Sequence, residues 1–141
     1  MATTDRSVEE QLAAASPFAR IGKRGLRSLA SAVKPVEHAE GHQILEEGGL
    51  PLGFHLITAG EAVVEVAGQE RRRLGAGDYF GLISLIDGKP RSATVRAATP
   101  LRTLFLSPSV FNQALDREPT IARDMLPLLC EFVREAEHRA S

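Results

Sequence analysis

The spacing of apolar residues changes twice along the chain and divides it into three parts. In the first part, Leu26, Leu29, Ala30 and Val33 recur three or four residues apart, which is the spacing of one helix face. Between residues 36 and 106, short runs rich in β-branched residues alternate with glycine and proline. Helical spacing returns after residue 106. The pattern therefore predicts helices over residues 8–35, strands over residues 36–106 and helices again over residues 107–140.

The first part contains signals for two helix starts and stops. Ser7 and Glu10 have the spacing of a capping box, so we expect a short helix over residues 8–15. A second helix is expected over residues 23–33. It ends before Pro35, because the residue preceding a proline is disfavoured in the helical conformation.

The central part is predicted to be mainly β-structure. Short runs separated by turn residues are typical of an antiparallel sandwich or small barrel. Residues 82–86 form an apolar half-turn that interrupts this pattern with a short helix. The expected strands cover residues 43–45, 54–58, 62–66, 71–74, 93–97 and 101–106.

The last part is predicted to hold a helical pair. Ser107 and Pro108 supply an N-cap and a proline at the first helical position. The final helix is expected to start at Pro119, reach about Arg139 and kink at Pro127, which cannot donate a backbone hydrogen bond.

The final helix carries more apolar side chains than one buried face requires. A second row, Leu126, Cys130 and Val133, lies beside the first row, which contains Ile121, Met125, Leu128, Leu129, Phe132 and Ala136. We therefore expect two packing surfaces on this helix, one of them a homodimer interface. The expected interface residues are Met125, Leu129, Phe132 and Val133.

Composition favours one cytoplasmic domain. The chain has 141 residues, of which 43% are hydrophobic and 25% charged, and its formal net charge is −1. This length suits a single domain over residues 1–141, with residues 1–7 disordered. A near-neutral chain has no general attraction for DNA, no apolar run is long enough to span a membrane, and a single cysteine is typical of a reducing compartment. The sequence after the last helix ends without a helix-turn-helix, so direct DNA binding is not expected.

One stretch, FGLISLIDGKPRSATV over residues 80–95, carries candidate binding chemistry. Its turns present successive backbone N–H groups, which form concavities for anions. Arg91 adds a planar cation suited to phosphate, and Ser92 adds a hydroxyl group. This combination predicts an anion-binding site.

The same stretch resembles the phosphate-binding cassette of cyclic nucleotide-binding domains. That family has Phe-Gly-Glu, a short apolar segment, and then Pro-Arg followed by a small residue. The resemblance extends to the Gly41–Leu45 run with Glu47 and Gly48, to the hairpin at Gly60, and to the Gly77-Asp78-Tyr79 approach. It implies an antiparallel β-roll, or jelly-roll barrel, with flanking helices at both ends, as in the catabolite activator protein and the protein kinase A regulatory subunit.

By this resemblance, the chain is expected to bind cAMP, cGMP or another phosphorylated small molecule without catalysing a reaction. Arg91 would pair with the cyclic phosphate, and Ser92 with the backbone of Gly81, Ile83 and Ser84 would complete its cradle. The candidate ligand-binding residues are Phe80, Gly81, Leu82, Ile83, Ser84, Pro90, Arg91, Ser92 and Ala93.

Leu82 departs from the family pattern, which has glutamate at this position to accept a hydrogen bond from the ribose 2′-hydroxyl. Loss of a charged acceptor is expected to weaken binding by about ten- to hundredfold. Three alternatives follow: an unusual ligand, weak binding of a standard one, or an empty pocket. The last alternative makes the chain a ligand-independent module for protein interaction or dimerisation.

Other chemistry is not indicated by the sequence. No Ser-His-Asp arrangement, paired carboxylate site or Walker-type loop appears, so no enzyme is predicted. The four histidines lack the close pairing of a β-barrel metal site and are expected to be structural or solvated; they are His38, His42, His55 and His138. Cys130 is expected to be a small buried hydrophobic residue.

Overall fold

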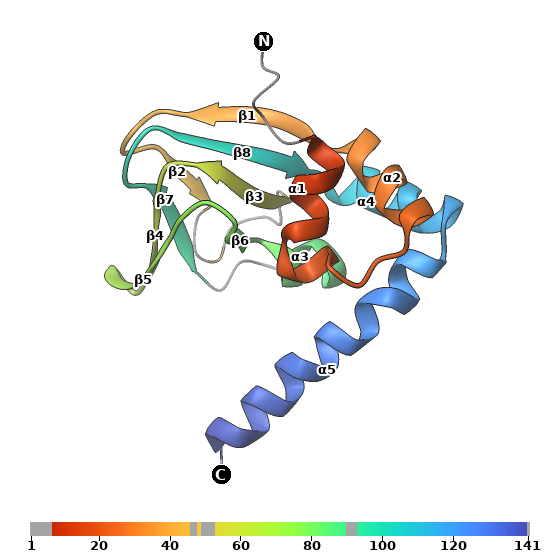
Figure 1. Cartoon of the computed structure of the whole chain (residues 1–141). Coiled ribbons are helices and arrows are strands. Elements are labelled where there is room, and N and C mark those ends of the chain that lie inside the picture. The colour runs from red at the N-terminus through yellow and green to blue at the C-terminus, as the bar shows by residue number, and fades with distance from the viewer. Residues whose placement is uncertain (1–6, 46–47, 49–52, 90–92, 141) are drawn as a thin grey trace. The chain divides into compact units, whose positions relative to one another are not determined.

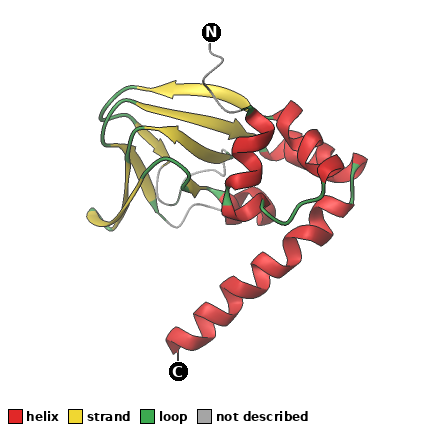
Figure 2. Cartoon of the chain, in the orientation of Figure 1, coloured by secondary structure: helices red, strands yellow, loops and turns green. Residues whose placement is uncertain are grey.

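The computed structural model describes residues 7–45, 48, 53–89 and 93–140, except for the side chain of Ser16. The chain divides into two compact units. One comprises residues 32–112, and the other comprises residues 1–31 with residues 113–141. Figures 1 and 2 show that the first unit contains the strands and that the second is helical.

In the described residues, eight strands form two antiparallel sheets of four strands each. The first sheet has the order β1-β8-β3-β6, and the second has the order β2-β7-β4-β5. Their bounds are Lys34–His38 for β1, Gln43–Leu45 for β2, Phe54–Ala59 for β3, Ala62–Val66 for β4, Gln69–Leu74 for β5, Tyr79–Phe80 for β6, Thr94–Ala97 for β7 and Leu101–Leu106 for β8. The expected β-roll architecture with flanking helices is confirmed.

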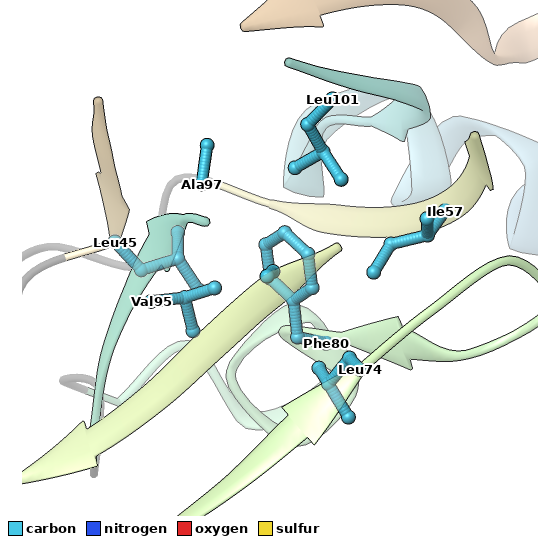
Figure 3. Packing of buried hydrophobic residues seen from close by; sticks show 8 residues of the cluster. Leu45, Ile57, Leu74, Phe80, Val95, Ala97 and Leu101 are labelled. Carbon is cyan, nitrogen blue, oxygen red and sulfur yellow. The ribbon is translucent and has the colours of Figure 1, made fainter. Parts of the chain in front are cut away.

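A buried apolar cluster joins the two sheets. Ile57, Phe80 and Leu101 come from the first sheet, and five residues come from the second. Figure 3 shows these side chains pointing toward one another between the strands. The five from the second sheet are Leu45, Ala62, Leu74, Val95 and Ala97. Removing this apolar surface from water stabilises the packing of one sheet on the other.

The helical unit is held by short-range capping and by contacts between distant segments. Helix α1, Val8–Ala14, begins at the expected capping box, in which the Ser7 side chain accepts from the Glu10 N–H at 3.1 Å. The Gly22 N–H donates to Asp124 of helix α5, Thr120–Ala140, at 3.0 Å. The remaining helices are the short 3₁₀ helix Ser16–Phe18, α2 over Lys23–Ala32, and α4 over Pro108–Arg117, which begins in the β unit. None of the described helices is both long enough and apolar enough to cross a membrane.

Three details differ from the sequence-based expectations. Strands β1 and β6 were not among the predicted strands. Cys130 is exposed, so the expectation that it is buried is wrong. The expected N-cap at Ser107 is confirmed, because its hydroxyl accepts from the Val110 N–H at 3.3 Å. The single-domain boundaries and the kink at Pro127, which does lie inside α5, stay predictions.

Gly60, in the turn between β3 and β4, is expected to be hard to replace. Its φ is +92°, and a Cβ atom there would collide with the Pro100 carbonyl oxygen and lie 3.0 Å from the Leu101 Cα. Gly77 has nearly the same φ, +93°, but no atom lies within 4 Å of a Cβ built there. The two glycines therefore separate the cost of an unfavourable φ from the cost of a close backbone approach.

We expect Gly77→Ala to lower the free energy of unfolding by about 1–2 kcal/mol, the cost of a left-handed conformation for an L-residue. Gly60→Ala should cost about 3 kcal/mol or more, because backbone must also move. Urea denaturation of both variants measures the difference. Equal losses would show that the approach to Pro100 does not constrain the turn.

Candidate functional site

Two glycines in the left-handed conformation bracket the short helix of the cassette, which we define as residues 80–93. Gly81 precedes helix α3, Leu82–Asp87, with φ +88°, and its carbonyl accepts from the Leu85 N–H at 3.1 Å. Gly88 ends the helix with φ +71°, and its N–H donates to the Ser84 carbonyl at 2.9 Å. Glycine adopts this conformation without the steric cost of a Cβ atom. The backbone therefore enters and leaves α3 along a fixed path.

The cassette side chains are divided between the interior and the surface. Phe80, Leu82 and Ser84 are buried, whereas Ile83 is 51% exposed and Ala93 is half-buried. Because Leu82 is only 3% exposed, the position where the resemblance expects a glutamate carries a buried hydrocarbon with no acceptor. Pro90, Arg91 and Ser92 lie outside the described residues, so their predicted roles stay predictions.

Strand register places two rows of inward-facing residues beside the cassette. Residues directly opposite each other in antiparallel strands share one face of the sheet. In the first sheet, Phe80 of β6 is opposite His55 of β3, which is opposite Phe105 of β8. In the second sheet, one row runs Leu45, Val95, Val64 and Arg72 across β2, β7, β4 and β5. Phe80 is the first residue of the cassette and Val95 lies two residues after its last, so each row contains a residue at one end of the cassette.

A polar group that the sequence did not reveal lies on the inner face of the first sheet. The Thr103 hydroxyl is 2.9 Å from His55 Nδ1 and 3.3 Å from His38 Nε2. The His38 ring stacks on His42 at 5.7 Å, and the His55 ring stacks on Phe80 at 4.9 Å. His38 and His55 come from β1 and β3, which both pair with β8, so strand pairing brings these two histidines to Thr103.

Within the described residues, this group lacks the ligands of a metal centre. Among the described residues, no set of three histidine, cysteine, aspartate or glutamate side chains is arranged so that it could hold a metal ion. Burial of the ring, followed by repulsion from His42, lowers the pKa of His38 below its ordinary value. The group is therefore a pair of histidines, His38 and His55, that are both hydrogen-bonded to the Thr103 hydroxyl. Its surroundings disfavour the protonated form of His38.

Comparison with known proteins identifies the family. Residues 35–118, more than half of the chain, match the model of the cyclic nucleotide-binding domain. The chain belongs to the cyclic nucleotide-binding domain family. The matched residues include all eight strands except the first residue of β1, and they contain the entire cassette.

Regulatory subunits of cAMP-dependent protein kinase are among its relatives. The chain is 34% identical over 97 residues to the subunit of Emericella nidulans, a match covering 67% of this chain and 24% of the relative. It is 39% identical over 88 residues to the subunit of Eremothecium gossypii, covering 62% of this chain and 19% of the relative. The chain thus spans about a quarter or less of the length of these relatives.

Solved structures share the fold over most of the chain. The catabolite activator protein of Thermus thermophilus superposes with a TM-score of 0.76 at 27% identity, covering 89% of this chain and 62% of that one. The N-terminal domain of a transcriptional regulator from Streptomyces coelicolor A3(2) also gives 0.76, at 23% identity, covering 87% and 89%.

The lowered pKa of His38 predicts how stability depends on pH. In the unfolded chain this group titrates near 6.5, and in the folded chain it binds a proton only at lower pH. As the pH falls below about 6.5, the unfolded state therefore takes up the proton first, and the free energy of unfolding decreases. Above that pH the contribution of His38 to stability is fully present.

We expect His38→Gln to reduce the loss of stability between pH 7.5 and pH 5.5, measured by urea denaturation at each pH. His138→Gln is the control, because His138 is exposed on α5 and far from this group in sequence. A His38→Gln protein with the same pH slope as the wild type would contradict the assignment.

Proposed function

We propose that this chain is a non-enzymatic regulatory module that binds a cyclic nucleotide or a related phosphate ligand in its cassette. Family membership supports this proposal, and the relatives named above are regulatory subunits. The observation that carries it is the backbone of α3, which begins and ends at the left-handed glycines Gly81 and Gly88. We place the module in the cytoplasm, in keeping with its single cysteine.

The leucine at position 82 is the reason to expect that standard cyclic nucleotides bind only weakly. A buried leucine cannot accept the hydrogen bond of a ribose hydroxyl, which would then lose its water without gaining a partner. We therefore expect cAMP and cGMP to bind in the micromolar range or more weakly.

A second candidate function is a ligand-independent module for protein interaction. The observation that favours it is the apolar surface on α3, where Ile83 is 51% and Ile86 is 40% exposed next to the buried Leu82. Exposed apolar side chains of this size are common at interfaces. Ligand titration separates the two functions, because only the first requires Arg91.

We expect Arg91→Ala to abolish the ligand-induced increase in melting temperature that cAMP or cGMP produces in the wild type. The reason is loss of a charge-assisted hydrogen bond to phosphate, which is worth about ten- to hundredfold in affinity. Calorimetric titration and thermal-shift measurements at millimolar nucleotide give the readout.

Arg73→Ala is the matched control for this change. Arg73 is exposed on β5 and pairs with Glu61 and Glu70, so its loss should leave ligand binding unchanged. Equal ligand-induced shifts in the wild type and the Arg91→Ala protein would remove Arg91 from the proposed site. No shift in the wild type at millimolar nucleotide would overturn the binding proposal and leave the interaction module.

We further propose that α5 transmits the signal and mediates a homodimer. Leu126 is 56% and Val133 is 57% exposed, and Cys130 between them is also exposed. Spacings of four and three residues place these side chains on one face of the helix. Met125, which the sequence placed in the interface, is only 3% exposed and faces the interior. We therefore propose an interface of Leu126, Leu129, Phe132 and Val133.

We expect Val133→Glu to convert a dimer to a monomer, because a two-fold contact would bring two introduced carboxylates into one apolar interface. Sedimentation velocity at high micromolar concentration measures the state. His138→Glu introduces the same charge away from this face and should remain dimeric. A monomeric wild type would remove the dimer from the proposal.

A further inference from the structure

The ring of His55 contacts both the first sheet and the start of the cassette. It stacks on Phe80, the first cassette residue, with the ring centroids 4.9 Å apart and an angle of 15° between the planes. The Phe105 ring of β8 lies 5.0 Å from it. Phe80 is followed directly by Gly81, whose carbonyl accepts a backbone hydrogen bond of α3. The position of the buried His55 ring therefore affects where the cassette begins.

A single hydroxyl group links His55 to His38. Thr103 Oγ1 is 2.9 Å from His55 Nδ1 and 3.3 Å from His38 Nε2. A hydroxyl has one hydrogen, so when both bonds are made it donates to one ring nitrogen and accepts from the other. The two bonds are therefore interdependent, and a proton gained at His38 changes what Thr103 offers to His55. Thr103 is 1% exposed, so water does not readily take the place of either ring.

Among the described residues, the groups in contact with His38 offer no negative charge to its protonated form. His42 stacks on the ring at 5.7 Å, and His55 meets it edge-on at 5.4 Å. Arg96 of β7 approaches from the second sheet, where it donates to the carbonyl of the residue before His42 at 3.4 Å and pairs with Glu65 at 3.6 Å. A proton on His38 therefore meets two other imidazole rings, and the carboxylate on this side is already paired.

The charged residues of β1 and β8 do not compensate for this charge. Glu37 precedes His38 on β1, so it faces the opposite side of the sheet, and it pairs there with Arg102 of β8 at 3.6 Å. Lys34 shares the His38 face of β1 but is exposed at the other end of the strand. Burial of the ring, followed by repulsion from His42, lowers the pKa of His38. Protonation therefore favours arrangements in which this ring is more exposed.

We propose that Thr103 and His55 are positioning residues for the cassette and that protonation of His38 releases them, so that ligand binding weakens. The inference rests on the proposed function and concerns the regulation of the same site. When His38 leaves its place beside Thr103, the hydroxyl loses one of its two partners and no longer fixes the His55 ring. Phe80 then loses the support on which it stacks. The arrangement that binds the ligand thus holds His38 neutral.

Calorimetric titration with cGMP at pH 7.5, 6.5 and 5.5 measures this dependence. We expect the wild-type affinity to be nearly constant between pH 7.5 and 6.5 and to fall by up to about tenfold between pH 6.5 and 5.5, the limit for one proton. A cyclic phosphodiester lacks the second ionisation of a phosphomonoester, so the charge of the ligand stays constant over this range. An affinity that rises as the pH falls overturns the inference, because attraction between a protonated histidine and the phosphate would explain it.

Four variants separate positioning from a general effect on stability. His38→Gln removes the titrating ring, and Thr103→Val removes the hydroxyl at nearly constant volume, so both should abolish the pH dependence. Thr103→Ser keeps the hydroxyl and should retain it. Thr58→Val is the matched control, because it removes a β3 hydroxyl that donates instead to the Arg102 carbonyl at 3.3 Å. A Thr103→Val protein with the wild-type pH profile overturns the inference and leaves the proposed function intact.

Hydrogen exchange without ligand tests the inference independently of the proposed function. The Leu85 and Gly88 amides donate to carbonyls at the start of α3, and the Ala98 amide donates to the Glu61 carbonyl. Below pH 6.5 we expect the protection factors of the first two amides to fall in the wild type but not in His38→Gln, while that of Ala98 is unchanged. Equal losses at all three amides, or none at Leu85 and Gly88, overturn the inference. Absence of nucleotide binding at every pH overturns the proposed function, and the exchange result then decides whether the histidines position the cassette.

Discussion

Packing between the inner faces of the two sheets is the interaction on which the cassette depends. Phe80, just before α3, and Val95, just after the cassette, both belong to the cluster that joins the sheets. The two ends of the cassette are therefore held by the same buried contacts. A substitution elsewhere in this cluster, at Ile57 or Leu74, would therefore alter the geometry of the cassette although neither residue belongs to it. Stability of the β unit and geometry of the site are for this reason coupled.

The strands with strong local patterns could be predicted from the sequence, and those defined by their partners could not. The segments Gln43–Leu45, Ala62–Val66 and Leu101–Leu106 were placed at their observed bounds. Strand β6 has two residues, too few to show any alternation. Strand β1 contains a proline and is largely exposed, and its pairing with β8 defines it. Whether such a segment forms a strand depends on the partner strand, so the sequence of the segment alone does not reveal it.

The same distinction separates the features of the candidate site. Gly81 and Gly88 stand out in a linear pattern, because glycine is required where a turn needs a positive φ. The association of His38, His55 and Thr103 depends on the register of β1, β3 and β8. Residues 71–73 are three consecutive arginines, and strand pairing is what places Arg72 opposite Val64 and Arg73 opposite Val63. The burial expected for Cys130 was wrong because helical spacing shows which side chains share a face, but not which face is covered.

The two left-handed glycines around α3 make the path of the backbone independent of which side chains lie between them. Six residues lie within this frame, and the frame is closed by backbone hydrogen bonds that no side chain supplies. Substitutions inside it can change what the site recognises while the route of the chain stays the same. Leu82 is such a substitution relative to the family pattern. Under the proposed function, point mutations at the exposed positions of α3, such as Ile83 and Ile86, would alter ligand preference while the backbone keeps its route.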